Sequence, residues 1–436
     1  MLQTRRHRLD RLAGLRYHHK LVLSLLVVFG ILLLVVLLAK DRENIKLESA
    51  YGASDARFPA YIAALAGAAP TSGNRFDVLQ NGDVFFPAML DAIVRARRRI
   101  DFETYIYEKG IAGDRFTAAL EAAARRRVDV NLVVDAVGSK QMSSDDATRL
   151  RAAGVRLGTF GAPRWFKLQE INYRTHRKLL VIDGAVAFTG GAGVADQWLG
   201  NAQDSDHWRD MMVRIDGPLA RLLEGAFNAS FVSTVAPVEP RVTPASIALD
   251  VASHDSAFVI RSAATGGSND MKRVYMLAIA AARRTLDITS PYFLMDASSK
   301  WALAQAAARG VRVRILVEGD DTDARIVKYA SREEYRRLMA EGIAIYEYQS
   351  TMMHTKSLVV DGTWSMFGSA NFDNRSLELN DELNVAVSDA DLAARLTSAF
   401  DRDLQRARKL DLVSWRRRPA LEKGREFFWS YFSEVF

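Results

Sequence analysis

Helical and strand-like patterns of apolar residues follow one another along the chain, beginning with apolar positions at helical spacing over 89–94. An alternating strand at 100–107 comes next, and a second helix around 116–120 leads to an apolar strand at 128–134. A third helix ends at Gly154, a residue type that commonly terminates helices. This alternation predicts an α/β unit with helices packed on a sheet.

The same order of elements occurs a second time. The pattern predicts a helix at 276–284, a strand at 286–293, a helix at 301–309, a strand at 311–317 and a helix at 333–341. The repeat period is about 180 residues, which is too long for a solenoid and indicates duplication of a whole domain. The predicted fold class is therefore α/β, with two duplicated domains.

An apolar segment precedes both repeats. Leu21 to Ala39 is a run of 19 residues without a charge, and as a helix it would span about 28 Å, close to the thickness of a bilayer core. No small-x-small cleavage site follows it, so an uncleaved transmembrane signal anchor is favoured over a signal peptide. Six basic residues precede the run, whereas the charges after it are nearly balanced. This bias predicts a cytosolic N-terminus and a catalytic part on the periplasmic or extracytoplasmic side of the inner or plasma membrane.

These features divide the chain into consecutive parts. We expect a basic N-terminus at 1–20, the anchor at 21–39, a tether at 40–75, a first domain at 76–235, a second domain at 236–410 and a tail at 411–436. The tail combines basic and aromatic residues at helical spacing. This pattern is typical of an interfacial helix and equally of a terminal helix that packs its aromatic side chains on the domain. Both interpretations stay open.

Composition narrows the possible chemistry. With 436 residues, 49% of them hydrophobic and 25% charged, the chain is long enough for two packed units. It contains no cysteine, which excludes disulfides, thiol nucleophiles and cysteine-ligated metal sites. A formal charge of +7 favours an anionic partner, and nucleic acid, anionic lipid and phosphorylated small molecules all qualify.

The strongest chemical signal is one motif that occurs in both repeats, at 175–184 and 353–362. Counted from its histidine, each copy has Lys at +2, Asp at +7 and Gly at +8 and +14. The apolar residues between Lys and Asp predict a strand, on which His and Lys share one face. Asp points to the other face, so we expect an orienting or structural carboxylate there more than a contact to phosphate. Two such strands related by a pseudo-twofold axis would gather two imidazoles and two ammonium groups, as a phosphodiester site requires. The candidate catalytic residues are His176, Lys178, Asp183, His354, Lys356 and Asp361.

With these motifs the chain resembles the phospholipase D superfamily with two HKD motifs, and most of all the bacterial cardiolipin synthases. The resemblance covers about residues 73 to 415. It includes the strings Glu103-Thr104-Tyr105-Ile106, Asn172-Tyr173-Arg174, Trp208-Arg209-Asp210, Ser290-Pro291-Tyr292 and Gly368 to Ser376, followed by Asn380 and Glu382. It implies two phospholipase D-like α/β/α domains forming a pseudo-twofold pair, and it requires no cofactor and no metal.

The resemblance also implies roles for individual residues. His176 would attack phosphorus to form a phosphohistidine, and His354 would serve as acid and then base. Glu382 is the candidate to orient His354, and Asp210 to orient His176. Ser369 and Asn371 would line the phosphate. In the first repeat Gly191 and Gly193 stand at these two positions, so backbone amides would have to replace the side chains.

The anchor favours a phospholipid substrate, phosphatidylglycerol or a similar lipid, over nucleic acid, because it holds the site at a bilayer. The predicted function is phosphatidyl transfer between phospholipids. A phospholipase D-type hydrolase or nuclease would use the same residues, and a non-catalytic lipid-binding scaffold is a third alternative that two intact motifs disfavour. The sequence leaves the acceptor alcohol and the oligomeric state open.

Overall fold

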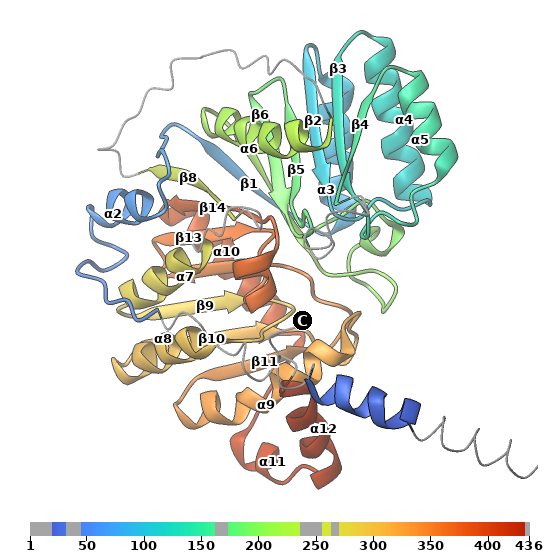
Figure 1. Ribbon diagram of the computed structural model, residues 1–436. Helices are drawn as coiled ribbons and strands as arrows, with labels where there is room; N and C mark the ends of the chain where they lie inside the picture. The colour runs from blue at the N-terminus through green and yellow to red at the C-terminus, as the bar shows by residue number, and fades with distance from the viewer. Residues whose placement is uncertain (1–19, 32–44, 162–172, 236–254, 263–269, 432–436) are drawn as a thin grey trace, which may run out of the picture.

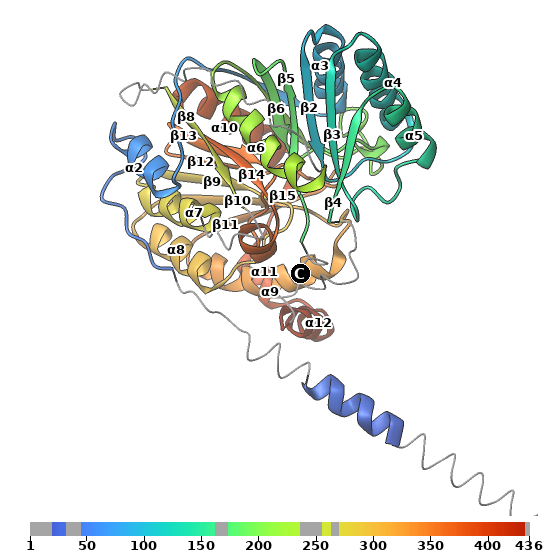
Figure 2. The same cartoon turned by 45° about the horizontal axis from the view of Figure 1, so that its top comes forward.

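The computed structural model describes residues 20–31, 45–161, 173–235, 255–262 and 270–431. Within these residues the chain forms two mixed β-sheets, each with helices on its outer face (Figure 1). The same two units are seen from another direction in Figure 2.

The first sheet has seven strands in the order β1-β7-β6-β5-β2-β3-β4. Strands β2, β3 and β4 pair in parallel, and every other neighbouring pair is antiparallel. Strand β5 is buried along its whole length, as expected at the centre of a sheet covered on both faces. The strands are β1 Arg75–Gln80, β2 Arg99–Thr104, β3 Asp129–Asp135, β4 Arg156–Phe160, β5 Lys178–Ile182, β6 Val186–Gly190 and β7 Met211–Asp216.

The second sheet repeats this plan with one strand added at its edge. Its order is β15-β11-β10-β9-β12-β13-β14-β8, and without β15 the order and relative directions match the first sheet strand for strand. The predicted duplication of an α/β domain is therefore confirmed. The strands are β8 Ser256–Arg261, β9 Thr285–Thr289, β10 Arg312–Val317, β11 Ala344–Tyr348, β12 Ser357–Val360, β13 Trp364–Gly368, β14 Leu383–Ser388 and β15 Ala407–Lys409.

The two domains share a hydrophobic core between their sheets. Helices α6 (Leu219–Thr234) and α10 (Ala390–Leu404) lie in this central layer, together with the inner faces of both sheets. The ring of Phe76 on the first sheet meets that of Phe367 on the second edge-on, with centroids 6.4 Å apart. A shared core of this kind fixes the two domains relative to each other. The outer helices are α3 Gly82–Arg95, α4 Ile111–Arg125 and α5 Ser144–Ala152 on the first domain, and α7 Asp270–Ala281, α8 Ala297–Ala308 and α9 Arg325–Ala340 on the second.

The segment predicted as a tether at 40–75 is in part a packed helix. Helix α2 (Phe58–Leu65) precedes the first domain in sequence but packs on the second domain, near α7. Phe58 and Ile62, one helical turn apart, are fully buried there, and the Phe58 ring lies 5.9 Å from that of Trp364. The prediction of a tether outside the folded part is wrong for these residues, because the two side chains give a short, alanine-rich segment an apolar face.

The C-terminal tail shows features of both interpretations that the sequence left open. Helices α11 (Leu412–Arg416) and α12 (Ala420–Ser430) pack beside α9. Trp415 is only 6% exposed, whereas Phe427 and Phe428 are 53% and 56% exposed. The Arg418 guanidinium stacks on Trp415 and forms two hydrogen bonds with the carboxylate of Glu426. The tail thus docks through Trp415 and leaves an aromatic face uncovered.

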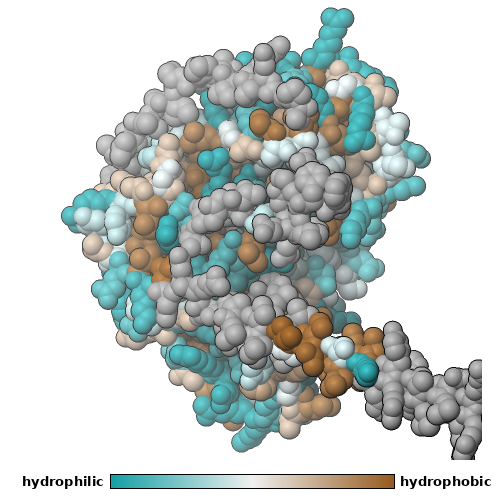
Figure 3. Space-filling model, viewed as in Figure 1, coloured by the Kyte–Doolittle hydropathy of each residue, from teal (hydrophilic) through white to brown (hydrophobic). Residues whose placement is uncertain are grey.

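The predicted anchor is described only in its first part. Residues 20–31 are helical, with every side chain exposed, and they form the apolar rod that protrudes from the molecule in Figure 3. Residues 32–39 of the predicted anchor lie outside the described residues. Among the helices of the described ranges, none is both long and apolar enough to cross a membrane.

Candidate active site

The two motifs occupy equivalent central strands, β5 and β12, but their histidines precede these strands. Strand β5 begins at Lys178 and β12 at Ser357. The prediction that His and Lys both belong to the strand is therefore wrong for both histidines and for Lys356, and it holds for Lys178. Each histidine lies on a segment that pairs with the other domain. The His176 amide donates to the Asp381 carbonyl (2.9 Å), and the His354 amide donates to the Arg209 carbonyl (2.7 Å).

As a result of these backbone pairings, the imidazole of each domain contacts a carboxylate of the other domain. His176 Nδ1 lies 2.9 Å from Glu382 Oε1, and His354 Nδ1 lies 2.9 Å from Asp210 Oδ2. The predicted pairing, Glu382 with His354 and Asp210 with His176, is therefore wrong. Glu382 directly follows Asp381, whose carbonyl accepts from the His176 amide, and Asp210 directly follows Arg209, whose carbonyl accepts from the His354 amide. Each histidine is therefore oriented by the opposite domain.

Both carboxylates are fully buried and held by further donors. Asp210 accepts hydrogen bonds from Trp198 Nε1 (2.9 Å) and from the Met211 amide (2.7 Å). Glu382 accepts from the Ser369 hydroxyl (2.5 Å). A carboxylate fixed in this way holds a histidine ring in one tautomer and one orientation.

The residues predicted to line the phosphate separate into two groups. Asn371 borders the pocket, and its Oδ1 is buried with no hydrogen-bond partner among the described residues. Ser369 instead supports Glu382. The Gly191 amide donates to the Met211 carbonyl, so the predicted amide–phosphate contact is wrong for Gly191. A Cβ at Gly191 would lie 2.3 Å from Asp210 Oδ1, so glycine at this position makes room for the carboxylate that orients His354. A Cβ at Gly193 would lie 3.0 Å from Ile106.

The lysines of the motifs are buried beside their histidines. Lys178 Nζ donates to the His176 carbonyl (2.7 Å), and Lys356 Nζ donates to the His354 carbonyl (2.6 Å). Burial lowers the pKa of Lys178 well below its usual range, and repulsion by Lys356 lowers it further. Burial likewise lowers the pKa of Lys356 to about 8, although Asp210 and Glu382 oppose this shift. The mutual repulsion of two buried ammonium groups favours the binding of an anion beside them.

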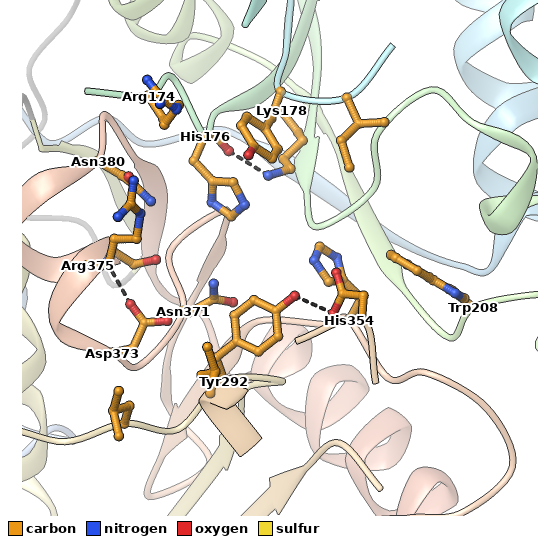
Figure 4. Close-up of a pocket in the computed structure, with 16 residues that line it drawn as sticks. Arg174, His176, Lys178, Trp208, Tyr292, His354, Asn371, Asp373, Arg375 and Asn380 are labelled. Atoms are coloured by element: carbon orange, nitrogen blue, oxygen red, sulfur yellow. Dashed lines mark hydrogen bonds between the residues drawn. The ribbon is translucent and has the colours of Figure 1, made fainter. Parts of the chain in front are cut away.

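Burial favours the neutral form of both imidazoles. Burial lowers the pKa of His176 to about 4, against the opposing effect of Glu382. Burial and then the charge of Lys356 lower the pKa of His354. Because each Nδ1 faces a carboxylate, Nδ1 carries the proton and Nε2 is left with its lone pair free. In Figure 4 both rings project into the same space.

The aspartates of the motifs lie at the other end of the strands. Asp183 accepts hydrogen bonds from the amides of residues 97–99, and Asp361 accepts them from the amides of residues 283–285. Both residues adopt positive φ, 55° and 54°, in the turn between two strands, a conformation that Asp tolerates better than most residues. The structure gives them the structural role that the spacing indicated, although they also stood among the catalytic candidates.

A pocket of about 210 Å³ opens above the two histidines. Several of its residues belong to strings that carry the family resemblance but had no predicted role: Tyr105, Arg174, Trp208, Tyr292, Asp373, Arg375 and Asn380. Asp323 and Val327, near the start of α9, had no signal in the sequence. Within the described ranges, no group of three or more His, Asp or Glu residues is placed to hold a metal ion.

Comparison with known proteins agrees with this geometry. A family model described as "Cardiolipin synthase, PLD-like domain" matches residues 89–230 and 275–404. A probable cardiolipin synthase of Bacillus subtilis (strain 168) is 32% identical over 365 residues, which cover 82% of this chain and 71% of that protein. A cardiolipin synthase of Geobacillus thermodenitrificans is 34% identical over 346 residues, which cover 78% of this chain and 68% of that protein.

A solved structure supports the same fold at greater sequence distance. The phosphatidylserine synthase of Haemophilus influenzae Rd KW20 superposes with a TM-score of 0.67 at 15% sequence identity. The superposition covers 87% of this chain and 97% of that one. At this level of identity the similarity concerns the arrangement of the two domains.

Proposed function

The chain belongs to the cardiolipin synthase family of phospholipase D-like proteins and is a phosphatidyltransferase of that superfamily, and on this basis we propose that it joins two phosphatidylglycerol molecules into cardiolipin through a phosphohistidine. The observation that carries the proposal is the pair of imidazoles in one pocket, each with Nδ1 fixed by a buried carboxylate and each beside a buried lysine. A phosphodiester needs this combination of nucleophile, acid and positive charge.

The first half-reaction forms the covalent intermediate. His176 Nε2 attacks phosphorus of the donor lipid, and the bond from phosphorus to the headgroup oxygen breaks. His354, protonated once the anionic lipid is bound, gives its Nε2 proton to that oxygen, so that glycerol leaves as a neutral alcohol. Lys178 and Lys356 supply the charge that offsets the phosphate. The products are glycerol and a phosphatidyl group on His176.

The second half-reaction transfers that group. His354, now neutral, takes the proton from the headgroup hydroxyl of a second phosphatidylglycerol, whose oxygen attacks phosphorus. The bond from phosphorus to nitrogen breaks, and His176 is free again. Two phosphatidylglycerols thus yield one cardiolipin and one glycerol, with both histidines restored.

A product analysis tests the function. The full-length protein in phosphatidylglycerol vesicles should form cardiolipin and glycerol in equal amounts. Phosphatidic acid as the only lipid product would indicate a phospholipase D-type hydrolase, and cleavage of nucleic acid with no turnover of lipid would indicate a nuclease.

Trapping the intermediate tests the assignment of the histidines. With a lipid ester of p-nitrophenol, a leaving group that needs no acid, His354→Ala should accumulate the adduct on His176, whereas His176→Ala should form none. Mass spectrometry locates it. An adduct on His354 would reverse the roles, and no adduct in either variant would refute the covalent mechanism.

We also propose that residues 21–39 anchor the enzyme in the membrane with the active site on the extracytoplasmic side. The support is the uncharged run itself, the basic residues before it and the exposed apolar side chains of residues 20–31. Protease added to spheroplasts should digest the catalytic part. Protection that ends only on lysis would place the active site in the cytosol.

A further inference from the structure

Two arginines on one wall of the active-site pocket have no part in the chemistry described above. Arg174 and Arg375 both line the pocket. In Figure 4 they lie with Asn380 on one side of the histidines, while Trp208 lies on the opposite side. Both side chains are partly exposed, so a ligand in the pocket can reach them. The pocket therefore has a cationic wall in addition to the buried lysines beside its two histidines.

The backbone holds this wall together from two domains. The Asp381 amide donates to the Arg174 carbonyl (2.8 Å), and the Asn380 amide donates to the Arg375 carbonyl (2.9 Å). Thr175, between Arg174 and His176, forms a β-bridge with Asp381. The same contacts that bring Glu382 to His176 thus bring the two arginines to one side of it.

Carboxylates in the pocket offset this charge only in part. Asp323 accepts a hydrogen bond from the Tyr292 hydroxyl (2.6 Å), and in Figure 4 Tyr292 lies away from Arg174. Asp373 lies beside Arg375 and accepts from the Ser376 amide (2.7 Å), and burial raises its pKa to about 7. A guanidinium group, unlike a carboxylate of this kind, is charged throughout the physiological pH range.

The reaction of a single phosphodiester does not require this second cationic group. In the proposed reaction the two lysines offset the charge of the phosphate that is attacked, and the alcohol that leaves is neutral. An acceptor such as water or glycerol brings no charge. An acceptor that is itself a phospholipid brings a second phosphate, and a planar guanidinium binds phosphate oxygens in a bidentate manner.

We propose that Arg174 and Arg375 form an acceptor subsite that binds the phosphate of the incoming phospholipid; this rests on the phosphatidyl transfer proposed above. In phosphatidylglycerol a three-carbon headgroup separates that phosphate from the terminal hydroxyl. With the phosphate on the arginine wall, the hydroxyl extends toward the phosphorus on His176, two residues from Arg174. The subsite selects acceptors that carry a phosphate next to their hydroxyl.

Two labelled acceptors that differ only in the phosphate test the subsite. Glycerol and glycerol 3-phosphate are offered separately to the full-length enzyme with a lipid donor, and kcat/KM is measured for each phosphatidylated product. In Arg174→Gln/Arg375→Gln the ratio of glycerol 3-phosphate to glycerol should fall at least tenfold, because hydrogen bonds to charged groups are removed. Arg174→Lys/Arg375→Lys should restore part of the ratio, since it keeps the charge.

Arg115→Gln, on the exposed face of α4, is the matched control and should leave the ratio unchanged. In the double glutamine variant, an equal loss of kcat/KM with both acceptors would assign the arginines to the donor lipid and overturn the proposal. No change of kcat/KM with either acceptor would overturn it as well. Phosphatidic acid as the only product of the wild-type enzyme, with either acceptor, would refute phosphatidyl transfer itself, and the subsite with it.

Discussion

Glu382→Gln is the most direct test of the crossed histidine pairs. Glu382 is fully buried and accepts from His176 Nδ1 at 2.9 Å. Glutamine keeps the shape and one acceptor oxygen but removes the charge. A charge-assisted hydrogen bond contributes about 1.5–3 kcal/mol and a neutral one about 0.5–1.5. The loss of about 1 to 1.5 kcal/mol should slow formation of the phosphohistidine roughly five- to tenfold.

The assay separates the two half-reactions. With a lipid ester of p-nitrophenol, the burst of p-nitrophenol reports formation of the intermediate and the steady-state rate reports its breakdown. Glu382→Gln should slow the burst. Asp210→Asn, which acts on His354, should leave the burst within about twofold and slow the breakdown, because this leaving group needs no acid while the acceptor still needs a base.

The pH profile provides a readout that a general loss of structure would not give. The charge of Glu382 raises the pKa of His176 and so opposes the larger effect of burial. Without that charge the pKa of His176 falls further, and the acidic limb of the burst rate should shift to lower pH. A slower breakdown with an unchanged burst in Glu382→Gln would refute the assignment of Glu382 to the nucleophile.

Four further predictions follow from the packing and electrostatics. Gly191→Ala should reduce phosphatidyl transfer more than about tenfold, because its Cβ would displace Asp210, whereas Gly225→Ala, with no atom within 4 Å of its Cβ, should have no effect on the same assay. Phe58→Ala should destabilise the protein by about 3–5 kcal/mol and lower the thermal unfolding midpoint. Tyr61→Ala on the same helix is the control and should have a much smaller effect, since Tyr61 is 39% exposed; equal midpoints for the two variants would indicate that this segment is a tether. Because the pKa of Lys356 is lowered to about 8, the lysine loses its charge as the pH rises through that value, so the KM for phosphatidylglycerol should increase above about pH 8. Since the two lysines supply the charge, activity should survive exhaustive EDTA treatment, and a loss restored by zinc or magnesium would contradict their assignment.

The sequence predicted the elements that repeat more successfully than the contacts between them. The repeated order of helices and strands predicted the duplicated α/β domains, and the equivalent positions of His176 and His354 predicted a shared site. Both signals are local, because periodicity and motif offsets are contained within each half. The partners of the histidines depend on how the halves face each other. Nothing near Glu382 in sequence indicates His176, more than two hundred residues away, so an intradomain pairing was the natural and wrong expectation.

Other differences have local physical causes. The strand predicted at 100–107 ends at Thr104, because the residues after it turn to form the wall of the pocket at Tyr105. The motif offset predicts a phosphate-binding amide at Gly191, but the small size of this residue makes room for the Asp210 carboxylate, whose position only the fold reveals. The sequence does not predict helix α2, because two buried side chains in an alanine-rich segment form too weak a periodic signal.

The exchange of orienting carboxylates between the halves also bears on how such a chain arose. Before the duplication, one copy of the motif would have had a histidine without its carboxylate and a carboxylate without its histidine. Two identical copies related by a twofold axis would have completed both pairs at once. The crossed pairs thus make each half incomplete by itself, and only the two halves together supply both histidines with their orienting carboxylates.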